Sequence, residues 1–182
     1  SGAKNVDNAL ISLVRLLRPV FNSSAIVWTL QEELDYIENY IDLMKLRHGG
    51  NIDFTVTGQR EYRELKLPRF ILQPIMENCF QHAIAGTDGR LKIRLSVLEN
   101  RDKYELVIED NGSGIEDEVI VQLNSLFESE KVEQWEEDHD HTRIGLYNVN
   151  RRLKLRYGPE SGLKIDQNFK EGARILLYLA KK

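Results

Sequence analysis

A short acidic and glycine-rich stretch is the first feature of the sequence that could do chemistry. It reads Asp110-Asn111-Gly112-Ser113-Gly114 and follows the alternating segment 103–109, which is typical of a strand with one apolar face. A carboxylate at a strand end can accept a hydrogen bond from an exocyclic amino group such as that of adenine. Two glycines one residue apart let the backbone turn and approach a ligand closely. The same residues also fit an ordinary turn, so this stretch alone leaves both interpretations open.

A second set of polar side chains lies within the otherwise apolar segment 67–84. Its members are Glu77, Asn78, Gln81 and His82. Asn78 and His82 are four residues apart, so on a helix they share one face. An amide oxygen suits a hard cation such as Mg²⁺, although the same pattern also describes the polar face of a half-buried helix. Pro68 suits the start of this helix, whereas Pro74 predicts a kink or a later start.

A third stretch, 142–158, predicts a helix that opens at Gly145 and is capped by Gly158. The free backbone N–H groups at the start of such a helix form a site suited to phosphate. The basic side chains of this helix could serve phosphate or only solubility. The acidic segment 128–141 before it predicts a mobile loop, and its two histidines fit a solvated loop better than a metal site.

The remaining patterns predict the elements that would position these residues. Strands are expected at 52–57, 91–98, 104–109, 163–166 and 173–179, the second and third forming a hairpin. Two amphipathic helices are expected near the N-terminus, over 5–18 and 29–47. The second begins with a capping box of Thr29 and Glu32. The apolar stripe of this second helix is wide, and we expect part of it to pack in the core and part to form a subunit interface.

Composition limits the classes of function. The chain has 182 residues, and 41% of them are hydrophobic, which is enough for a packed core. The net charge of -4 argues against a nucleic-acid partner. Cys79 is the only cysteine, which excludes an intramolecular disulfide and fits a reducing compartment. There is no run of about 18 apolar residues and no signal peptide, so we expect no direct membrane contact from this chain. The first residues, Ser-Gly-Ala-Lys, are typical of a fragment of a longer protein.

Taken together and in this order, the three stretches resemble the ATP-binding catalytic domain of bacterial sensor histidine kinases, within the GHKL superfamily. Residues 72–78 with His82 are similar to the N box, residues 110–114 to the first glycine box, and residues 144–149 to the second. The helix at 30–41 is similar to the segment that joins the phosphoacceptor region to the catalytic domain in the LytS/YesM-type subclass.

The resemblance implies a fold and a cellular setting. The fold is a two-layer α/β sandwich of the Bergerat type, with a mixed, mainly antiparallel sheet covered by helices on one face. Residues 1–50 would be a helical linker and residues 51–182 the catalytic domain. We expect a cytoplasmic domain whose parent protein lies in the bacterial cytoplasmic membrane. Its partners would be a second copy of the full-length protein and a response regulator.

The resemblance also implies roles for single residues in binding Mg·ATP and passing its γ-phosphoryl group to a histidine. Asp110 would read the adenine amino group, and Asn78 would hold Mg²⁺. Glu77 would polarise, deprotonate or orient the incoming histidine, and His82 would lie near the phosphates. Residues 125–143 would form the ATP lid. The implied ATP-binding residues are Asn78, Asp110, Gly112, Gly114, Ile115, Arg143, Gly145 and Leu146.

Three departures from the family pattern bear on these roles. No Asn-Pro-His-Phe-like phosphoacceptor motif occurs, so we expect no autophosphorylation in cis. Arg143 takes a position where glycine is usual, and its side chain could crowd the phosphates or supply them with a cation. Ala173 follows Gly172 where threonine is usual, which removes a hydroxyl expected near the adenine.

Two other functions stay open. A degenerate, non-catalytic domain used for dimerisation or regulation would explain Arg143, Ala173 and the wide helical stripe. A gyrase- or Hsp90-like ATPase shares the boxes but should lack the linker helix, and is therefore less favoured.

Overall fold

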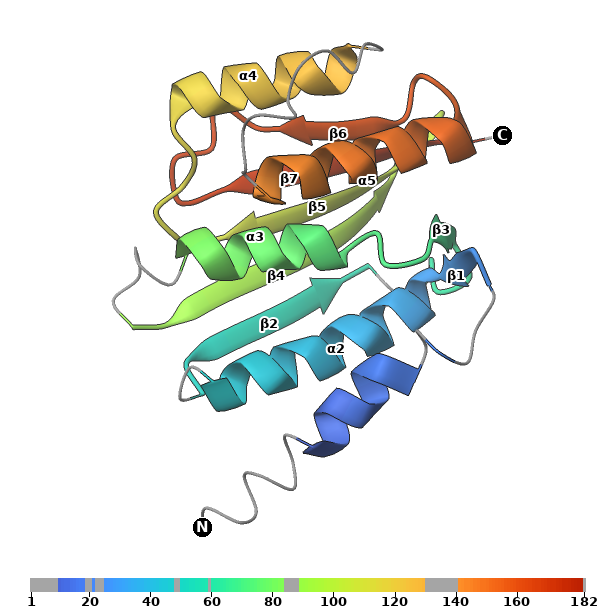
Figure 1. Ribbon diagram of the computed structural model, residues 1–182. Helices are drawn as coiled ribbons and strands as arrows, with labels where there is room; N and C mark the ends of the chain where they lie inside the picture. The colour runs from blue at the N-terminus through green and yellow to red at the C-terminus, as the bar shows by residue number, and fades with distance from the viewer. Residues whose placement is uncertain are drawn as a thin grey trace.

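The computed structural model describes residues 10–18, 21, 25–47, 50–58, 60–83, 89–129 and 141–181, and it shows a sheet with helices on one face (Figure 1). A helical segment over residues 10–18 comes first. The elements that follow are β1 (Val27–Thr29), α2 (Leu30–Arg47), β2 (Ile52–Thr57), β3 (Lys66–Pro68), α3 (Gln73–Ala83), β4 (Leu91–Glu99), β5 (Lys103–Asp110), α4 (Asp117–Glu128), α5 (His141–Tyr157), β6 (Gly162–Ile165) and β7 (Arg174–Ala180).

The main sheet has five strands in the order β2-β4-β5-β7-β6. β2 pairs with β4 in parallel, and the other three pairings are antiparallel. The central β4–β5 hairpin closes through a hydrogen bond of 2.8 Å from the Asn100 N–H to the Lys103 carbonyl. The predicted mixed, mainly antiparallel sheet and its hairpin are therefore confirmed.

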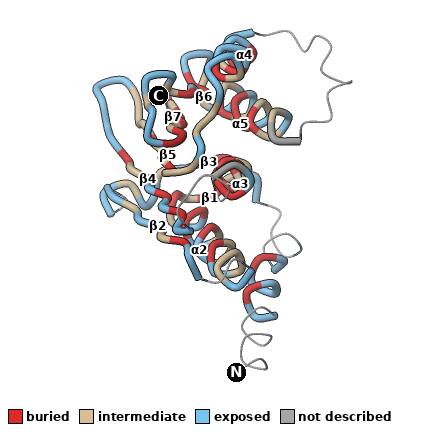
Figure 2. The backbone as a smooth tube through the Cα atoms, turned by 90° about the vertical axis from the view of Figure 1, so that its left-hand side faces the viewer, coloured by how far each residue is buried: buried red, intermediate tan, exposed pale blue. Residues whose placement is uncertain are grey.

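The helices bury one face of this sheet. Alternation in β4 sends Leu91, Ile93 and Leu95 into the core, while Lys92 and Arg94 point the other way. α3 and α5 pack against each other, and α4 packs against α5 and β6. Figure 2 shows buried residues on the sides of the helices and strands that face one another. The two-layer arrangement follows from this one apolar face.

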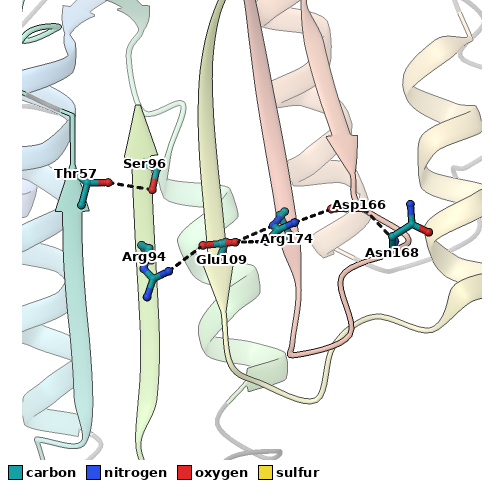
Figure 3. A network of polar contacts seen from close by, with 7 residues as sticks. All are labelled: Thr57, Arg94, Ser96, Glu109, Asp166, Asn168 and Arg174. Carbon is teal, nitrogen blue, oxygen red and sulfur yellow. Dashed lines mark hydrogen bonds and ion pairs between the residues drawn. The ribbon is translucent and has the colours of Figure 1, made fainter. Parts of the chain in front are cut away.

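The other face of the sheet is open and charged. Glu109 of β5 bridges Arg94 of β4 at 3.7 Å and Arg174 of β7 at 2.6 Å, and Arg174 continues to Asp166 at 3.0 Å (Figure 3). A hollow of about 640 Å³ lies on this face. Such a ladder of opposite charges stabilises neighbouring strands and keeps this face hydrated.

α2 is part of the same core. Its capping box is confirmed, because the Glu32 N–H donates to the Thr29 hydroxyl at 3.1 Å and the Thr29 N–H donates to the Glu32 carboxylate at 2.7 Å. Its apolar stripe is buried with the residues of the sheet and of α3, and the members of the stripe are Leu30, Leu34, Ile37 and Ile41. The core part of the expectation for this stripe is therefore confirmed, and the subunit interface stays a prediction.

The structure corrects two local expectations. Pro68 does not start a helix: it lies in β3, which pairs with β1 in a two-stranded ribbon that the sequence analysis did not predict. α3 begins at Gln73, so Pro74 lies in its first turn, where the missing N–H costs nothing. The later start predicted from Pro74 is thus correct.

The segment over residues 10–18 buries little of its predicted stripe. Leu10, Leu13, Val14 and Leu17 are exposed, whereas Leu16 is buried. Residues 5–9, the first part of the predicted helix, lie outside the described part. No helix in the described ranges is both long enough and apolar enough to cross a membrane.

Candidate functional site

The three predicted stretches meet at one side of the helical layer, where β5 ends and α5 begins (left in Figure 1). The thiol of Cys79 in α3 hydrogen-bonds to Asp110 at the end of β5. Gly145 of α5 lies against α3, since a Cβ at this position would be 3.4 Å from the Pro74 side chain. The hollow on the open face reaches Asp110 but is not lined by Glu77 or Asn78, so the candidate site is on the helical side.

Asp110 is held by backbone groups on both sides. It is 7% exposed, and its Oδ1 accepts the Gly112 N–H at 2.8 Å and the Ala173 N–H at 3.3 Å. Its own N–H donates to the Ala173 carbonyl at 3.0 Å. Burial, followed by the charge of Asp110, raises the pKa of the Cys79 thiol well above its ordinary value. The Asp110 carboxylate is therefore fixed in direction at the strand end.

Gly172 shapes this end of the site and was not among the predicted site residues. Its φ is +148°, and a Cβ there would be 1.9 Å from the Asp110 carbonyl oxygen. Gly114, which was predicted, has a φ of +76°, and its Cβ would be 3.1 Å from the Gly172 carbonyl oxygen. Gly112 does not adopt a positive φ and contributes its N–H instead. Only glycine at 172 lets the turn before β7 lie this close to β5.

Asn111 was read from the sequence only as a turn residue, yet it fastens the turn. Its Oδ1 accepts the Lys92 N–H at 2.7 Å, and its Nδ2 donates to the Arg90 carbonyl at 3.2 Å. The Asn111 side chain thus takes the place of a neighbouring strand's backbone and makes two hydrogen bonds to the start of β4. A turn asparagine that mimics a backbone group is a known use of this residue, so the signal was present but not specific.

Asn78 presents a buried amide group that lacks a partner. The residue is 4% exposed, and its Nδ2 finds no hydrogen bond within the described part of the chain. An unsatisfied buried polar group costs about 1–3 kcal/mol. Its neighbour Glu77 is half-buried in the same helix. The backbone of His82 continues this helix, but its side chain lies outside the described part, so its predicted role is not tested.

The lid side of the site differs from the prediction. α5 begins at His141, not at Gly145. The N–H groups of Gly145 and Leu146 therefore lie within the helix, where such groups bond to carbonyls one turn back. The expectation that they are the free N–H groups of a helix start is wrong. Arg143 is half-buried in the first turn, and residues 130–140 of the predicted lid lie outside the described part.

Glu33 is a further residue that the sequence analysis missed. It is fully buried in α2, and its carboxylate accepts the N–H groups of Phe70, Ile71 and Leu72 just before α3. Burial raises the pKa of Glu33 to about 7, against the opposing pull of these N–H groups and of Arg152. The signal was available, because Glu33 occupies a position in the apolar stripe of the helix.

The residues do not form a metal cage by themselves. Among the described residues, no group of three or more histidine, cysteine, aspartate or glutamate side chains could hold a metal ion. The amide oxygen of Asn78 is of a type that binds Mg²⁺ and could contribute a single ligand.

Comparison with solved structures supports the fold. The catalytic domain of histidine kinase ThkA has a TM-score of 0.57 at 18% identity, over 85% of this chain and 94% of that chain. Mycobacterial sensor histidine kinase MprB has a TM-score of 0.56 at 17% identity, over 85% of this chain and 95% of that chain.

Sequence relatives point the same way. Sensor histidine kinase YesM of Bacillus subtilis is 26% identical over 176 residues, which is 97% of this chain and 28% of the relative. Sensor protein LytS of Bacillus cereus is 29% identical over 153 residues, which is 84% of this chain and 25% of the relative. The chain thus spans about a quarter of the length of these relatives.

Two family models divide the chain between them. A model described as histidine kinase matches residues 1–52. A model described as histidine kinase-, DNA gyrase B-, and HSP90-like ATPase matches residues 63–182, which is well over half of the chain. This range includes both Asn78 and Asp110 of the candidate site. The chain therefore belongs to the histidine kinase-, DNA gyrase B- and HSP90-like ATPase family.

Proposed function

We propose that this chain is the ATP-binding catalytic part of a sensor histidine kinase of the LytS/YesM type. It would bind Mg·ATP and pass the γ-phosphoryl group to a histidine outside this chain, for onward transfer to a response-regulator aspartate. One observation carries the proposal. A fixed carboxylate, Asp110, contacts Cys79 of α3, and the preceding residue in that helix is Asn78, whose buried Nδ2 has no partner among the described residues.

The Asp110 end would hold the base. A carboxylate can accept about four hydrogen bonds, so Asp110 keeps capacity for the amino group of adenine beyond its contacts with Gly112 and Ala173. Because backbone groups fix its direction, little ordering is needed when the base arrives. Ile115, which packs against the core near this turn, would line the same region.

The Asn78 end would hold the phosphates. The unpartnered Nδ2 of Asn78 is a donor and fits a phosphate oxygen, which would leave the amide oxygen to bind a magnesium ion. Magnesium neutralises phosphate charge when it is bound with ATP. Glu77 would receive the proton of the attacking nucleophile or orient it. Arg143 and His82 remain proposed neighbours of the phosphates.

The wider assignments are part of the same proposal. Residues 1–50 would be the linker that follows the phosphoacceptor region, and residues 51–182 the catalytic domain. The full-length protein would be a homodimer anchored in the bacterial cytoplasmic membrane, with this part in the cytoplasm. The matches to sensor proteins named LytS and YesM support this setting.

A calorimetric titration of the chain with ATP, with and without Mg²⁺, tests the proposal. We expect binding that Mg²⁺ strengthens and that Asp110→Asn weakens, whereas Asp42→Asn, at an exposed aspartate of α2, serves as the control. Absence of binding in a folded sample would contradict the proposal and favour the non-catalytic dimerisation or regulatory domain. Steady hydrolysis without any phosphohistidine in the full-length protein would favour the gyrase-like ATPase.

A further inference from the structure

A chain of two hydrogen bonds connects α2 to Glu77. The Tyr36 hydroxyl donates to Oε1 of Gln73 at 3.1 Å, and Nε2 of Gln73 donates to Oε1 of Glu77 at 2.8 Å. Tyr36 belongs to α2, whereas Gln73 and Glu77 lie one turn apart in α3. The side chain of Glu77 is thus oriented through Gln73 by a residue 41 positions away in the sequence.

The chemistry of the three groups allows one arrangement of these bonds. An ionised carboxylate only accepts, so the NH₂ group of Gln73 must face Glu77. The amide oxygen is then left to face Tyr36, whose hydroxyl must donate. A tyrosine hydroxyl at this position therefore selects the amide orientation that serves Glu77, and successive bonds of this kind strengthen one another.

The ring of Tyr36 is itself held in place. It packs edge-on against Phe70 at a centroid distance of 4.8 Å and tilted against Trp28 at 5.8 Å. Trp28 lies in β1 and Phe70 follows β3, so the two strands of the ribbon contribute to the ring's surroundings. Burial and the charge of Glu77 raise the pKa of Tyr36, which keeps the hydroxyl protonated as a donor.

We propose that Tyr36 is a positioning residue for phosphoryl transfer, acting through Gln73 on the carboxylate of Glu77. The inference rests on the proposed function. In the transfer step, the nucleophile forms a bond to the γ-phosphorus, the bond to the bridging oxygen breaks, and ADP leaves with the electron pair. The proton of the nucleophile goes to Glu77, so the direction of this carboxylate affects the rate. The position of α2 is thereby coupled to the transfer step.

Tyr36→Phe tests the proposal, because it removes only the hydroxyl and keeps the ring contacts. Tyr40→Phe is the matched control. Tyr40 lies one turn further along α2 and also feels the charge of Glu77, but its hydroxyl makes no hydrogen bond with the residues described. Two quantities are measured: the Kd for Mg·ATP, and the rate at which γ-phosphate is released from labelled ATP at saturation, with water as the acceptor. The rate of Glu77→Gln gives the reference for complete loss of the Glu77 carboxylate.

We expect Tyr36→Phe to keep its Kd within about twofold and to lose about tenfold in rate, which is less than the roughly 100-fold loss that a misplacement of about 1 Å can cause. Tyr40→Phe should keep both values. In a Gln73→Met background, Tyr36→Phe should have no further effect, because the link is already broken. The Gln73 side-chain amide resonance, assigned by its loss in Gln73→Met, should shift in Tyr36→Phe and not in Tyr40→Phe.

Other outcomes separate this inference from the proposed function. If Tyr36→Phe releases phosphate at the wild-type rate while Glu77→Gln releases it slowly, the inference is overturned and the proposed function stands. Equal losses of rate and affinity in both tyrosine variants would show a merely structural role and overturn it as well. Binding without any phosphate release would leave Glu77 no step to assist, which overturns the inference but not the nucleotide site. Absence of ATP binding in the folded wild type would overturn both.

Discussion

The two ends of the candidate site are built in different ways. At the Asp110 end, the N–H groups of Gly112, after β5, and of Ala173, just before β7, hold the carboxylate, and a close glycine contact leaves no space for another arrangement. At the Asn78 end, the candidate functional groups are side chains on α3, and the Nδ2 of one buried amide lacks a partner among the described residues. The first end is complete without a ligand, whereas the second would be completed by one. Substitutions at the two ends should therefore affect stability in opposite directions.

The largest expected effect is at Gly172. Gly172→Ala places a Cβ 1.9 Å from the Asp110 carbonyl, which forces β5 and the turn apart. We expect a loss of more than about 3 kcal/mol in the free energy of unfolding, together with loss of ATP binding, measured by urea denaturation and calorimetry. The control is Gly158→Ala, because Gly158 also has a positive φ but an added Cβ there would have nothing within 4 Å. A similar loss of stability in this control would show that backbone strain, and not the close contact with Asp110, causes the loss at Gly172.

The next effect concerns the pH dependence of Glu33, which anchors the start of α3 and thus the Asn78 end. Its pKa is raised from 4.5 to about 7 on folding, so between these values the folded state holds a proton that the unfolded state has lost. The free energy of unfolding should fall as pH rises through this window, by roughly 3 kcal/mol in total.

Urea denaturation between pH 4.5 and 7 measures this slope. Glu33→Gln cannot titrate, so the variant should lack the component due to Glu33. Because the amide resembles the neutral acid, its difference from the wild type should be smallest at pH 4.5 and should grow towards pH 7. Equal slopes in both proteins would mean that Glu33 does not bind its proton on folding.

A smaller effect is expected from Asp110→Asn. The amide would keep one acceptor but lose the charge that would hold the adenine amino group, at a cost of about 2–3 kcal/mol, or roughly 30- to 150-fold in the Kd for ATP. Competition between ATP and GTP gives a sharper measurement, because the preference for ATP should disappear. A variant that binds ATP as tightly as the wild type would remove Asp110 from the base-binding role.

The smallest effect has the opposite sign and is the best test of the comparison. Asn78→Leu replaces the unpartnered amide with an apolar group of similar size. We expect the free energy of unfolding to rise by about 1–2 kcal/mol, while Mg²⁺ no longer strengthens ATP binding. Loss of stability in this variant would show that the amide already has a partner in the folded protein, and the contrast between the two ends would fail.

Local patterns in the sequence predicted much of the fold, because they report on neighbours in the chain. The alternation before Asp110, the hairpin turn and the capping box of Thr29 all appear in the structure as expected. The β1–β3 ribbon was missed because strands of three residues carry no periodicity. The start of α5 was misplaced because Gly145 reads as a boundary, although the helix passes through it.

The site was harder to predict than the fold, since it depends on register between distant segments. The need for glycine at position 172 arises only when β7 pairs with β5. The role of Glu33 arises only when α2 packs beside the start of α3. Residue type and spacing identified Asp110 and Asn78, but not what holds them.

The pairing of β5 with β7 also has a consequence for how the chain folds. The β4–β5 hairpin is closed by a short turn and can form early, whereas the Asp110 to Ala173 hydrogen bond joins residues 63 positions apart. Contacts of such long range form only after the intervening loop entropy has been overcome. A partly folded chain can thus contain the strand that ends at Asp110 without containing the site. If the proposed function is correct, nucleotide binding would occur only in chains in which β5 has paired with β7, and could therefore be used to detect that pairing.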